Sequence, residues 1–219
     1  MTRPSSKAHV LALCTALFAA TAAHANLLSN GSFESGAFVN QGNDTMSLAA
    51  GSAVISGWTV ATDTTAWIGP TNPFGLSAND GSFFLDLTNY QPGAPFAGMT
   101  QTIATTPGAI YALSFDLGGS TFWGRPDSIT ASAAGTSATF TTPSTGTNND
   151  WQHVSMQFSA SSSSTTWLLQ GAAGLNYIGL DNAAVECGAA SAVPEQGTWA
   201  LILAGFAVLG GMVRRRTRS

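Results

Sequence analysis

The chain has 219 residues, of which only 8% are charged, and its 7 basic and 11 acidic side chains give a formal net charge of −4. Six of the seven basic residues lie near the two ends, so the segment from Asn26 to Val193 combines one arginine with ten carboxylates, a formal charge of −9. This imbalance excludes nucleic acids and anionic lipid surfaces as favoured partners and leaves cations and neutral sugars.

The N-terminus has the pattern of an export signal. Arg3 and Lys7 precede an apolar run from Val10 to Ala20, which is too short to span a bilayer unaided. Ala23-His24-Ala25 then supplies the small residues that signal peptidase accepts. We therefore predict that residues 1–25 are a signal peptide.

Residues 26–187 are predicted to form one domain. Large apolar residues alternate with small or polar ones from Tyr111 to Leu117, and again at Val154, Met156 and Phe158, which places each set on one buried face. Clusters of Gly, Pro, Asn and Ser separate the other predicted strands. These strands are expected at 27–33, 54–60, 83–87, 99–103, 129–133, 138–141, 166–170 and 177–185. Many short strands without helices between them predict an all-β, antiparallel sandwich.

Short motifs occur in a fixed order along this domain. They are NLLSNGSFE at 26–34, ISGWTV at 55–60, DGSFFLDL at 80–87, QTI at 101–103, TPG at 106–108, YALSFD at 111–116 and LDN at 180–182. In this order they resemble the choice-of-anchor C family and related galactose-binding-like domains, including a cell-wall domain family of plants. The resemblance implies a jelly-roll β-sandwich. It implies sugar binding less specifically, since many domains of this architecture bind sugars and others only scaffold.

The same resemblance implies a structural calcium site. In related carbohydrate-binding jelly rolls, the glutamate that closes the opening motif and an aspartate of the last strand help to hold Ca²⁺, and Glu34 and Asp181 occupy these positions. Calcium prefers several oxygen ligands, so two carboxylates with nearby backbone carbonyls could join the two ends of the sandwich. The alternative is that Glu34 is a solvated carboxylate and that Asp181 caps a turn or the backbone.

Aromatic residues in Gly- and Pro-rich stretches are the candidate sugar contacts. An exposed ring there could stack on the apolar face of a sugar. Trp123, beside the lone Arg125, is the preferred platform, and Asp127 could accept a hydrogen bond from a sugar hydroxyl. The alternative is that these rings cap the core, which is the fate expected for Trp58 and Trp167. The other candidates are Trp67, Phe74, Phe122 and Trp151.

The residues give little support to catalysis. After removal of the signal peptide, His153 is the only histidine and Cys187 the only cysteine, and no Lys lies between Asn26 and Val193. No metal-triad, nucleophile–histidine or phosphate-binding motif is present. We therefore predict that the protein is not an enzyme. Cys187 is expected to be an ordinary small residue at the end of the last strand, with an intermolecular disulfide as the alternative.

The C-terminus has three parts after a linker at 188–193. Val193, Pro194 and Glu195 form a short motif, an apolar run follows from Trp199 to Val213, and four arginines come after it. As a helix, the segment from Thr198 to Val213 would rise about 24 Å, somewhat less than the roughly 30 Å hydrocarbon core, so arginine snorkelling or local thinning of the bilayer must cover the difference. The positive-inside rule keeps the basic end in the cytoplasm and the domain outside. The arginines are Arg214, Arg215, Arg216 and Arg218.

This arrangement over residues 194–219 resembles the PEP-CTERM sorting signal. In its family the signal is recognised and processed by exosortase, a membrane-embedded cysteine transpeptidase. The sequence departs from the pattern at Gln196, where many members have a second proline. A plain C-terminal membrane anchor is the alternative.

Together these features predict a non-catalytic exported protein. Exosortase is its expected partner and neutral polysaccharide its candidate ligand. The predicted location is the inner membrane, with the domain outside the cytoplasm, followed by the cell surface or an exopolysaccharide matrix after sorting. A purely structural matrix protein and, with less support, a glycoside-active enzyme are the alternatives.

Overall fold

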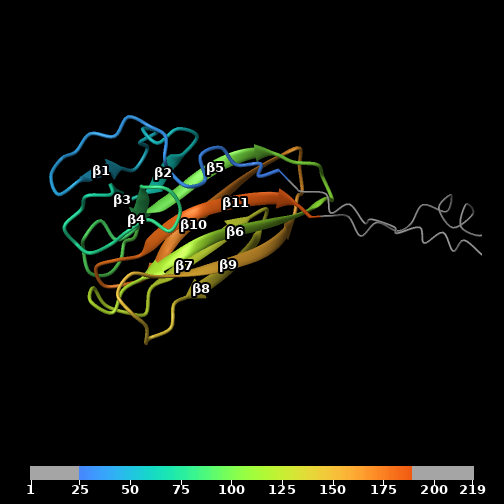
Figure 1. The fold of residues 1–219 in the computed structure, drawn as a ribbon. Coiled ribbons are helices and arrows are strands. Elements are labelled where there is room, and N and C mark those ends of the chain that lie inside the picture. The colour runs from blue at the N-terminus through green and yellow to red at the C-terminus, as the bar shows by residue number, and fades with distance from the viewer. Residues whose placement is uncertain (1–24, 189–219) are drawn as a thin grey trace, which may run out of the picture.

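The computed structural model describes residues 25–188, and every regular element in this range is a β-strand (Figure 1). The strands are β1 (Thr45–Ala49), β2 (Thr59–Thr62), β3 (Thr64–Ile68), β4 (Phe84–Asp86), β5 (Gly98–Ala104), β6 (Ile110–Gly119), β7 (Ser128–Ala133), β8 (Thr136–Thr141), β9 (Asp150–Ser159), β10 (Ser164–Ala173) and β11 (Gly179–Cys187). No helix in the described range could span a membrane. The predicted signal peptide, sorting motif and membrane helix lie outside these residues.

The strands form two antiparallel sheets. One has six strands in the order β1-β3-β4-β11-β6-β9, and the other has five in the order β2-β5-β10-β7-β8. The long strands of both sheets run along the length of the molecule in Figure 1. The longest pairing joins β6 to β9, from Ile110 opposite Ser159 to Gly119 opposite Asp150. The predicted all-β, antiparallel sandwich is confirmed.

The main core lies between the two sheets. The alternating residues predicted to face it do so, since Leu113, Phe115 and Leu117 are fully buried in one cluster with Val154, Met156 and Phe158. Trp58 and Trp167 meet edge to face in the same cluster, with ring centroids 5.0 Å apart. Both tryptophans are therefore core residues, as predicted.

A second, smaller core lies on the outer face of the six-stranded sheet. Successive strand residues point to opposite faces, so Trp67 and Leu85 enter the main core while Ile68 and Phe84 point outward. The connection between β3 and β4, residues 69–83, packs against these outward residues through Phe74, Leu76 and Ala78. We call this connection the covering loop. Because of the covering loop, the six-stranded sheet is buried on both faces around Ile68 and Phe84.

The segment predicted as a strand at 27–33 is not one, although the structure buries its apolar residues Leu28 and Phe33. The Asn26 side chain accepts hydrogen bonds from the backbone N–H of Leu28 and of Val185, both at 3.0 Å. Asn30 and Phe33 take positive φ values, 56° and 60°, which turn the chain. Asparagine side chains thus take up backbone hydrogen bonds that a strand would use.

Strands β1 and β3 were not predicted. Four of the five residues of β3 are buried, because its two faces meet the two cores. A strand buried on both faces shows no alternation of apolar and polar residues. The paired strand β1 is short and has only one large buried side chain, Leu48.

Candidate functional site

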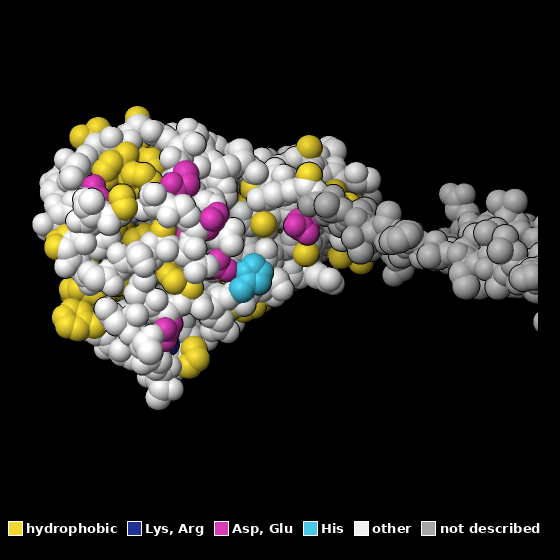
Figure 2. Space-filling view, in the orientation of Figure 1, with side chains coloured by type: hydrophobic (Ala, Val, Ile, Leu, Met, Phe, Trp, Pro, Cys, Tyr) yellow, Lys and Arg dark blue, Asp and Glu magenta, His cyan; other side chains and the backbone are white. Residues whose placement is uncertain are grey.

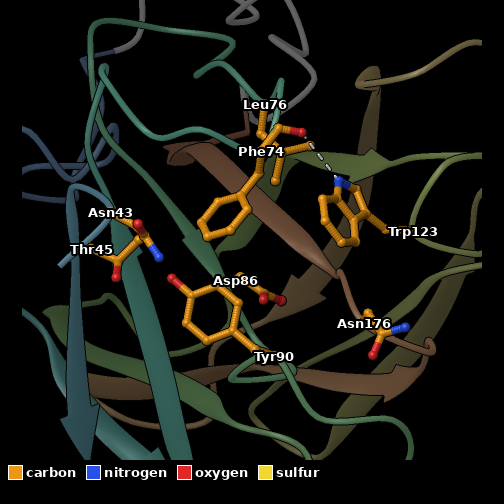
Figure 3. Close-up of a pocket in the computed structure, with 8 residues that line it drawn as sticks. All are labelled: Asn43, Thr45, Phe74, Leu76, Asp86, Tyr90, Trp123 and Asn176. Carbon is orange, nitrogen blue, oxygen red and sulfur yellow. Dashed lines mark hydrogen bonds between the residues drawn. The ribbon is translucent and has the colours of Figure 1, made fainter.

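A pocket of about 410 Å³ opens on the outer face of the six-stranded sheet. Thr45 of β1 and Asp86 of β4 reach it from the sheet, and side chains from the surrounding loops complete its wall (Figure 3). Three of these are aromatic rings from three separate loops. The loop residues are Asn43, Phe74, Leu76, Tyr90, Trp123 and Asn176. We call this site the aromatic pocket.

The covering loop holds Phe74 in place through polar side chains. Asn72 accepts a hydrogen bond from the backbone N–H of Phe74 at 3.2 Å and donates to the carbonyl of Leu76 at 3.0 Å. The carboxylate of Asp44 accepts from both the backbone N–H and the hydroxyl of Thr71, at 2.7 and 2.8 Å. The loop is therefore fixed by its own hydrogen bonds and presents the Phe74 ring to the cavity (Figure 3).

Trp123 comes from the connection between β6 and β7. The hydroxyl of Ser120 accepts hydrogen bonds from the backbone N–H groups of Phe122 and Trp123, at 3.1 and 3.3 Å, and so shapes a tight turn. The indole N–H of Trp123 reaches the carbonyl of Phe74 at 3.4 Å, the contact drawn as a dashed line in Figure 3. The two rings meet edge to face at 5.8 Å.

Tyr90 lies across the cavity from Trp123 (Figure 3). Asn89 and Tyr90 both have positive φ, 52° and 61°, an uncommon conformation for a bulky side chain that re-aims the tyrosine ring. Its centroid lies 5.7 Å from that of Phe74. Burial raises the pKa of Tyr90 to about 12, although a hydrogen bond with Thr45 acts in the opposite direction.

Asp86 supplies the negative charge of the aromatic pocket. Its side chain is only 1% exposed, and Oδ1 accepts hydrogen bonds from the backbone N–H groups of Thr88 and Ile178, at 2.9 and 3.0 Å. The hydroxyl of Thr88 lies 2.8 Å from Oδ1 and 3.0 Å from Oδ2. Burial raises the pKa of Asp86 to about 6, and these hydrogen bonds oppose the rise.

Of the three predicted sugar contacts, the structure brings only Trp123 into the aromatic pocket. The Arg125 side chain is 3% exposed, bonds to the carbonyls of Gly119, Pro143 and Thr145, and lies 3.3 Å from Asp150. Arg125 lines a separate cavity of about 280 Å³. Asp127 is fully buried, and neither of its carboxylate oxygens has a hydrogen-bond partner. Asp127 does not line the aromatic pocket, so its carboxylate is out of reach of a ligand bound there.

The other aromatic candidates divide between core and surface. Trp67 is 1% exposed and donates its indole N–H to the carbonyl of Phe33 at 3.0 Å, so of its two predicted places the structure shows the core. Trp151 packs edge to face on Phe84 at 5.8 Å. Phe122 is 72% exposed but does not line the aromatic pocket.

Buried carboxyls predict that the domain loses stability as pH rises. Burial raises the pKa of Asp86 to about 6 and those of Asp127 and Asp181 to about 7. Because the folded state binds these protons more tightly than the unfolded chain, their stabilising effect is full below pH 4 and is lost as pH rises to 7. We expect urea unfolding to give a free energy at pH 8 at least about 1.4 kcal/mol below that at pH 5, the value of one pKa unit.

Asp127→Asn tests whether buried carboxyls cause this pH dependence, because it removes one buried ionisable group while keeping its shape. It should reduce the difference in the free energy of unfolding between pH 5 and pH 8. Asp63→Asn, at an exposed turn with the same change in charge, should leave the difference unchanged. A free energy of unfolding that is constant or rises from pH 5 to pH 8 would contradict the expectation.

Glu34 and Asp181, the predicted calcium ligands, hold the two ends of one short segment. Asp181 Oδ2 accepts hydrogen bonds from the backbone N–H groups of Asn79 and Asp80, at 2.7 and 2.9 Å. Glu34 Oε1 accepts from those of Ser82 and Phe83, at 2.8 and 2.7 Å. Both carboxylates thus fasten the end of the covering loop to the sandwich. We call this pair of contacts the carboxylate clamp.

The clamp does not fit a calcium ion as it stands. Its amide hydrogens occupy positions on the carboxylate oxygens that a cation would need, and Asp181 Oδ1 also accepts from the N–H of Asn182 at 2.7 Å. Within residues 25–188, no group of three His, Cys, Asp or Glu side chains is placed to hold a metal ion. The calcium site stays a prediction of the sequence resemblance.

Chelation separates the two interpretations. If amide hydrogens satisfy Glu34 and Asp181, the melting temperature should be the same in calcium and in EDTA, as read by circular dichroism. A lower melting temperature in EDTA, restored by added calcium, would contradict the clamp and support the metal site.

A polar network crosses the outer face beside the clamp. His153, whose side chain is 63% exposed, lies with Nδ1 2.7 Å from Oδ1 of the buried Asp116. The side-chain amides of Asn79 and Asn182 donate to Asp116 Oδ2 at 2.6 and 3.0 Å. Figure 2 shows this face, with the histidine beside scattered carboxylates and little of the dark blue that marks Lys and Arg. His153 therefore faces solvent.

Sequence reasoning missed most of the aromatic pocket. Tyr90 could have been predicted in the same way as Trp123, because it is an aromatic residue beside the Pro92-Gly93 pair. Asn43, Asp86 and Asn176 carry no such signal, because only the fold brings them together. The predicted sorting residues Val193, Pro194, Glu195, Arg214, Arg215, Arg216 and Arg218 lie outside the described residues.

Comparison with known proteins identifies the family. Among solved structures, the chain is similar to the module TmCBM61, in complex with beta-1,4-galactotriose, with 15% identity and a TM-score of 0.43 over 74% of this chain and 99% of that one. It is also similar to a family 35 carbohydrate binding module from Clostridium thermocellum, with 12% identity and a TM-score of 0.40 over 65% and 91%. A search of curated proteins gave no match. A family model described as "Protein of unknown function (DUF642)" matches residues 26–175, so the chain belongs to the DUF642 family.

Proposed function

We propose that this protein binds carbohydrate in the aromatic pocket. The observation that carries the proposal is the convergence of three rings, Phe74, Tyr90 and Trp123, on one cavity of about 410 Å³ that also presents amide, hydroxyl and carboxylate groups. This volume lies in the range of about 300–1,000 Å³ that is usual for ligand sites.

The chemistry of the lining suits a sugar. A pyranose ring has apolar C–H faces that pack on aromatic rings, and hydroxyl groups around its edge that need hydrogen-bond partners. Asn43 and Asn176 offer both donors and acceptors, and the hydroxyl of Thr45 offers either. The loops that carry Phe74 and Trp123 are held by internal hydrogen bonds, which lowers the entropy cost of binding.

The proposed role is binding without catalysis. Hydrolysis of a glycosidic bond ordinarily requires two carboxyl groups on either side of the bond. Among the described residues that line the aromatic pocket, Asp86 is the one carboxylate, and its Oδ1 accepts two backbone hydrogen bonds. This arrangement favours recognition of an intact glycan.

A glycan array with the purified protein tests the proposal. Saturable binding to a defined set of glycans, with the same set bound in calcium and in EDTA, is the expected result. Failure to bind any glycan on the array, by a protein whose circular dichroism shows it to be folded, would overturn the proposal and favour a purely structural matrix role.

We also propose, from the sequence, that the chain is exported and sorted to the cell surface or matrix by exosortase. The export signal at 1–25 and the motif, apolar run and arginines at 194–219 support one topology. A reporter fused before Pro194 should be active only outside the cytoplasm. A cytoplasmic reporter would exclude this location.

A further inference from the structure

The side chains that line the aromatic pocket have a net negative charge, which limits the kinds of ligand that it can bind. Among the described residues that line it, Asp86 is acidic and none is Lys, Arg or His. A ligand that enters the pocket therefore meets a carboxylate without a neighbouring cation in the lining. An anionic ligand is disfavoured there by repulsion, which is strong where solvent is excluded.

One oxygen of Asp86 remains available to a ligand. Oδ1 accepts two backbone N–H groups, from Thr88 and Ile178. The hydroxyl of Thr88 lies 3.0 Å from Oδ2, and its single hydrogen is shared with Oδ1 at 2.8 Å. The backbone N–H of Tyr90 also interacts with this carboxylate. A carboxylate oxygen can accept more than one hydrogen bond, so Oδ2 has unused capacity.

The aromatic rings favour a cation at the same place. Phe74 lies 5.7 Å from Tyr90 and 5.8 Å from Trp123, measured between ring centroids, and the three rings line the same pocket as Asp86 (Figure 3). The face of an aromatic ring is negative and attracts an ammonium group within about 6 Å of its centroid. The three rings and the Asp86 carboxylate thus all attract a cation.

No described cation neutralises Asp86. Among residues 25–188, Arg125 is the only Lys or Arg, and His153 pairs with Asp116. The guanidinium of Arg125 is held by Asp150 at 3.3 Å and by the carbonyl of Gly119 at 3.0 Å.

We infer that the glycan bound in the aromatic pocket carries a free amino group, as a de-N-acetylated amino sugar does, and that its ammonium lies between Asp86 Oδ2 and the three rings. This inference rests on the proposed function, because it names the class of carbohydrate that the same pocket binds. Neutral sugars bind more weakly at this site, and uronic acids are rejected.

Isothermal titration at pH 6.5 with matched oligosaccharides tests the inference. The probes are a glucosamine oligomer, an N-acetylglucosamine oligomer of the same length and linkage, and a galacturonic acid oligomer. Because the pKa of Asp86 is about 6, this pH leaves its carboxylate mainly ionised while keeping much of the amine protonated. The glucosamine oligomer should bind at least 10-fold more tightly than the N-acetylated one, and the uronic acid oligomer should not bind.

Asp86→Asn should abolish this preference. Asparagine keeps a carbonyl oxygen for the backbone N–H groups of Thr88 and Ile178, so the fold is expected to survive. Asp63→Asn makes the same change in charge at an exposed turn outside the pocket and should keep the full preference. Asn176→Lys, on the exposed pocket rim, adds a cation and should also weaken glucosamine binding, which provides a test that does not alter Asp86.

The outcomes separate the inference from the function on which it rests. Equal affinity for the two amino-sugar oligomers, or a preference that survives both Asp86→Asn and Asn176→Lys, would overturn the inference and leave carbohydrate binding in place. Absence of binding to these probes and to every glycan on the array would overturn both.

Discussion

Trp167→Ala should lower the free energy of unfolding by about 3–5 kcal/mol, the range for removing a buried tryptophan. Trp167 is fully buried at the middle of the five-stranded sheet, where β10 pairs with both β5 and β7. Its ring packs edge to face on Trp58 at 5.0 Å. The loss would leave a large cavity between the sheets that the flanking strands cannot fill without breaking their pairing.

Trp167→Phe provides the matched comparison. The indole N–H of Trp167 is buried without a hydrogen-bond partner, so phenylalanine removes an unsatisfied polar group while keeping most of the apolar volume. Trp167→Phe should therefore lower the free energy of unfolding by clearly less than Trp167→Ala does. Urea unfolding at one pH measures the stability of all variants. Val39→Ala is the control, because this side chain is 60% exposed, and it should change the free energy of unfolding by less than about 0.5 kcal/mol. If Trp167→Ala and Val39→Ala lowered the free energy of unfolding equally, Trp167 would not be a core residue.

Trp123→Ala should weaken glycan binding by roughly 30-fold, which corresponds to the loss of about 2 kcal/mol expected for a central aromatic contact. The ring forms one wall of the aromatic pocket, and its indole N–H bonds to the backbone of the covering loop at Phe74. Alanine removes the packing surface for the sugar and frees that loop. Both effects reduce affinity.

Titration calorimetry with a glycan selected on the array measures this change. Trp123→Phe keeps an aromatic face and should retain part of the affinity. Ile110→Ala removes an exposed apolar side chain at the far end of β6, remote from the pocket, and should bind as the original protein does. Unchanged affinity in a folded Trp123→Ala variant would exclude this ring from the binding site.

The alternating strands could be predicted from the sequence because one of their faces meets the core and the other meets solvent. This holds for Tyr111 to Phe115 and for Val154 to Phe158. It fails for β3, whose two faces are both buried under separate clusters. It also fails at residues 27–33, where the side chains of Asn26 and Asn30 replace strand hydrogen bonds.

The candidate site was predictable only in part. An aromatic ring beside glycine and proline selected Trp123 as a surface-loop residue, and Trp123 lines the aromatic pocket. Sequence proximity then suggested Arg125 and Asp127 as its companions, but neighbours along a strand or loop often point in different directions. The residues that do accompany Trp123, such as Asp86 and Tyr90, come from other elements.

The carboxylate clamp connects the fold to the site. Glu34 and Asp181 hold the end of the covering loop, and Phe74 of the same loop forms a wall of the aromatic pocket. The two acidic residues that the sequence resemblance selected as metal ligands therefore position the candidate site through backbone amides. Their place at the two ends of the domain joins the first and last parts of the described chain.

The most direct test of carbohydrate binding in the aromatic pocket is an NMR titration of the protein with a glycan that it binds. The account predicts that ring resonances of Phe74, Tyr90 and Trp123 shift together and saturate, while those of the buried Trp58 and Trp167 do not change. Saturable shifts confined to another face of the sandwich, with these three rings unaffected, would contradict it.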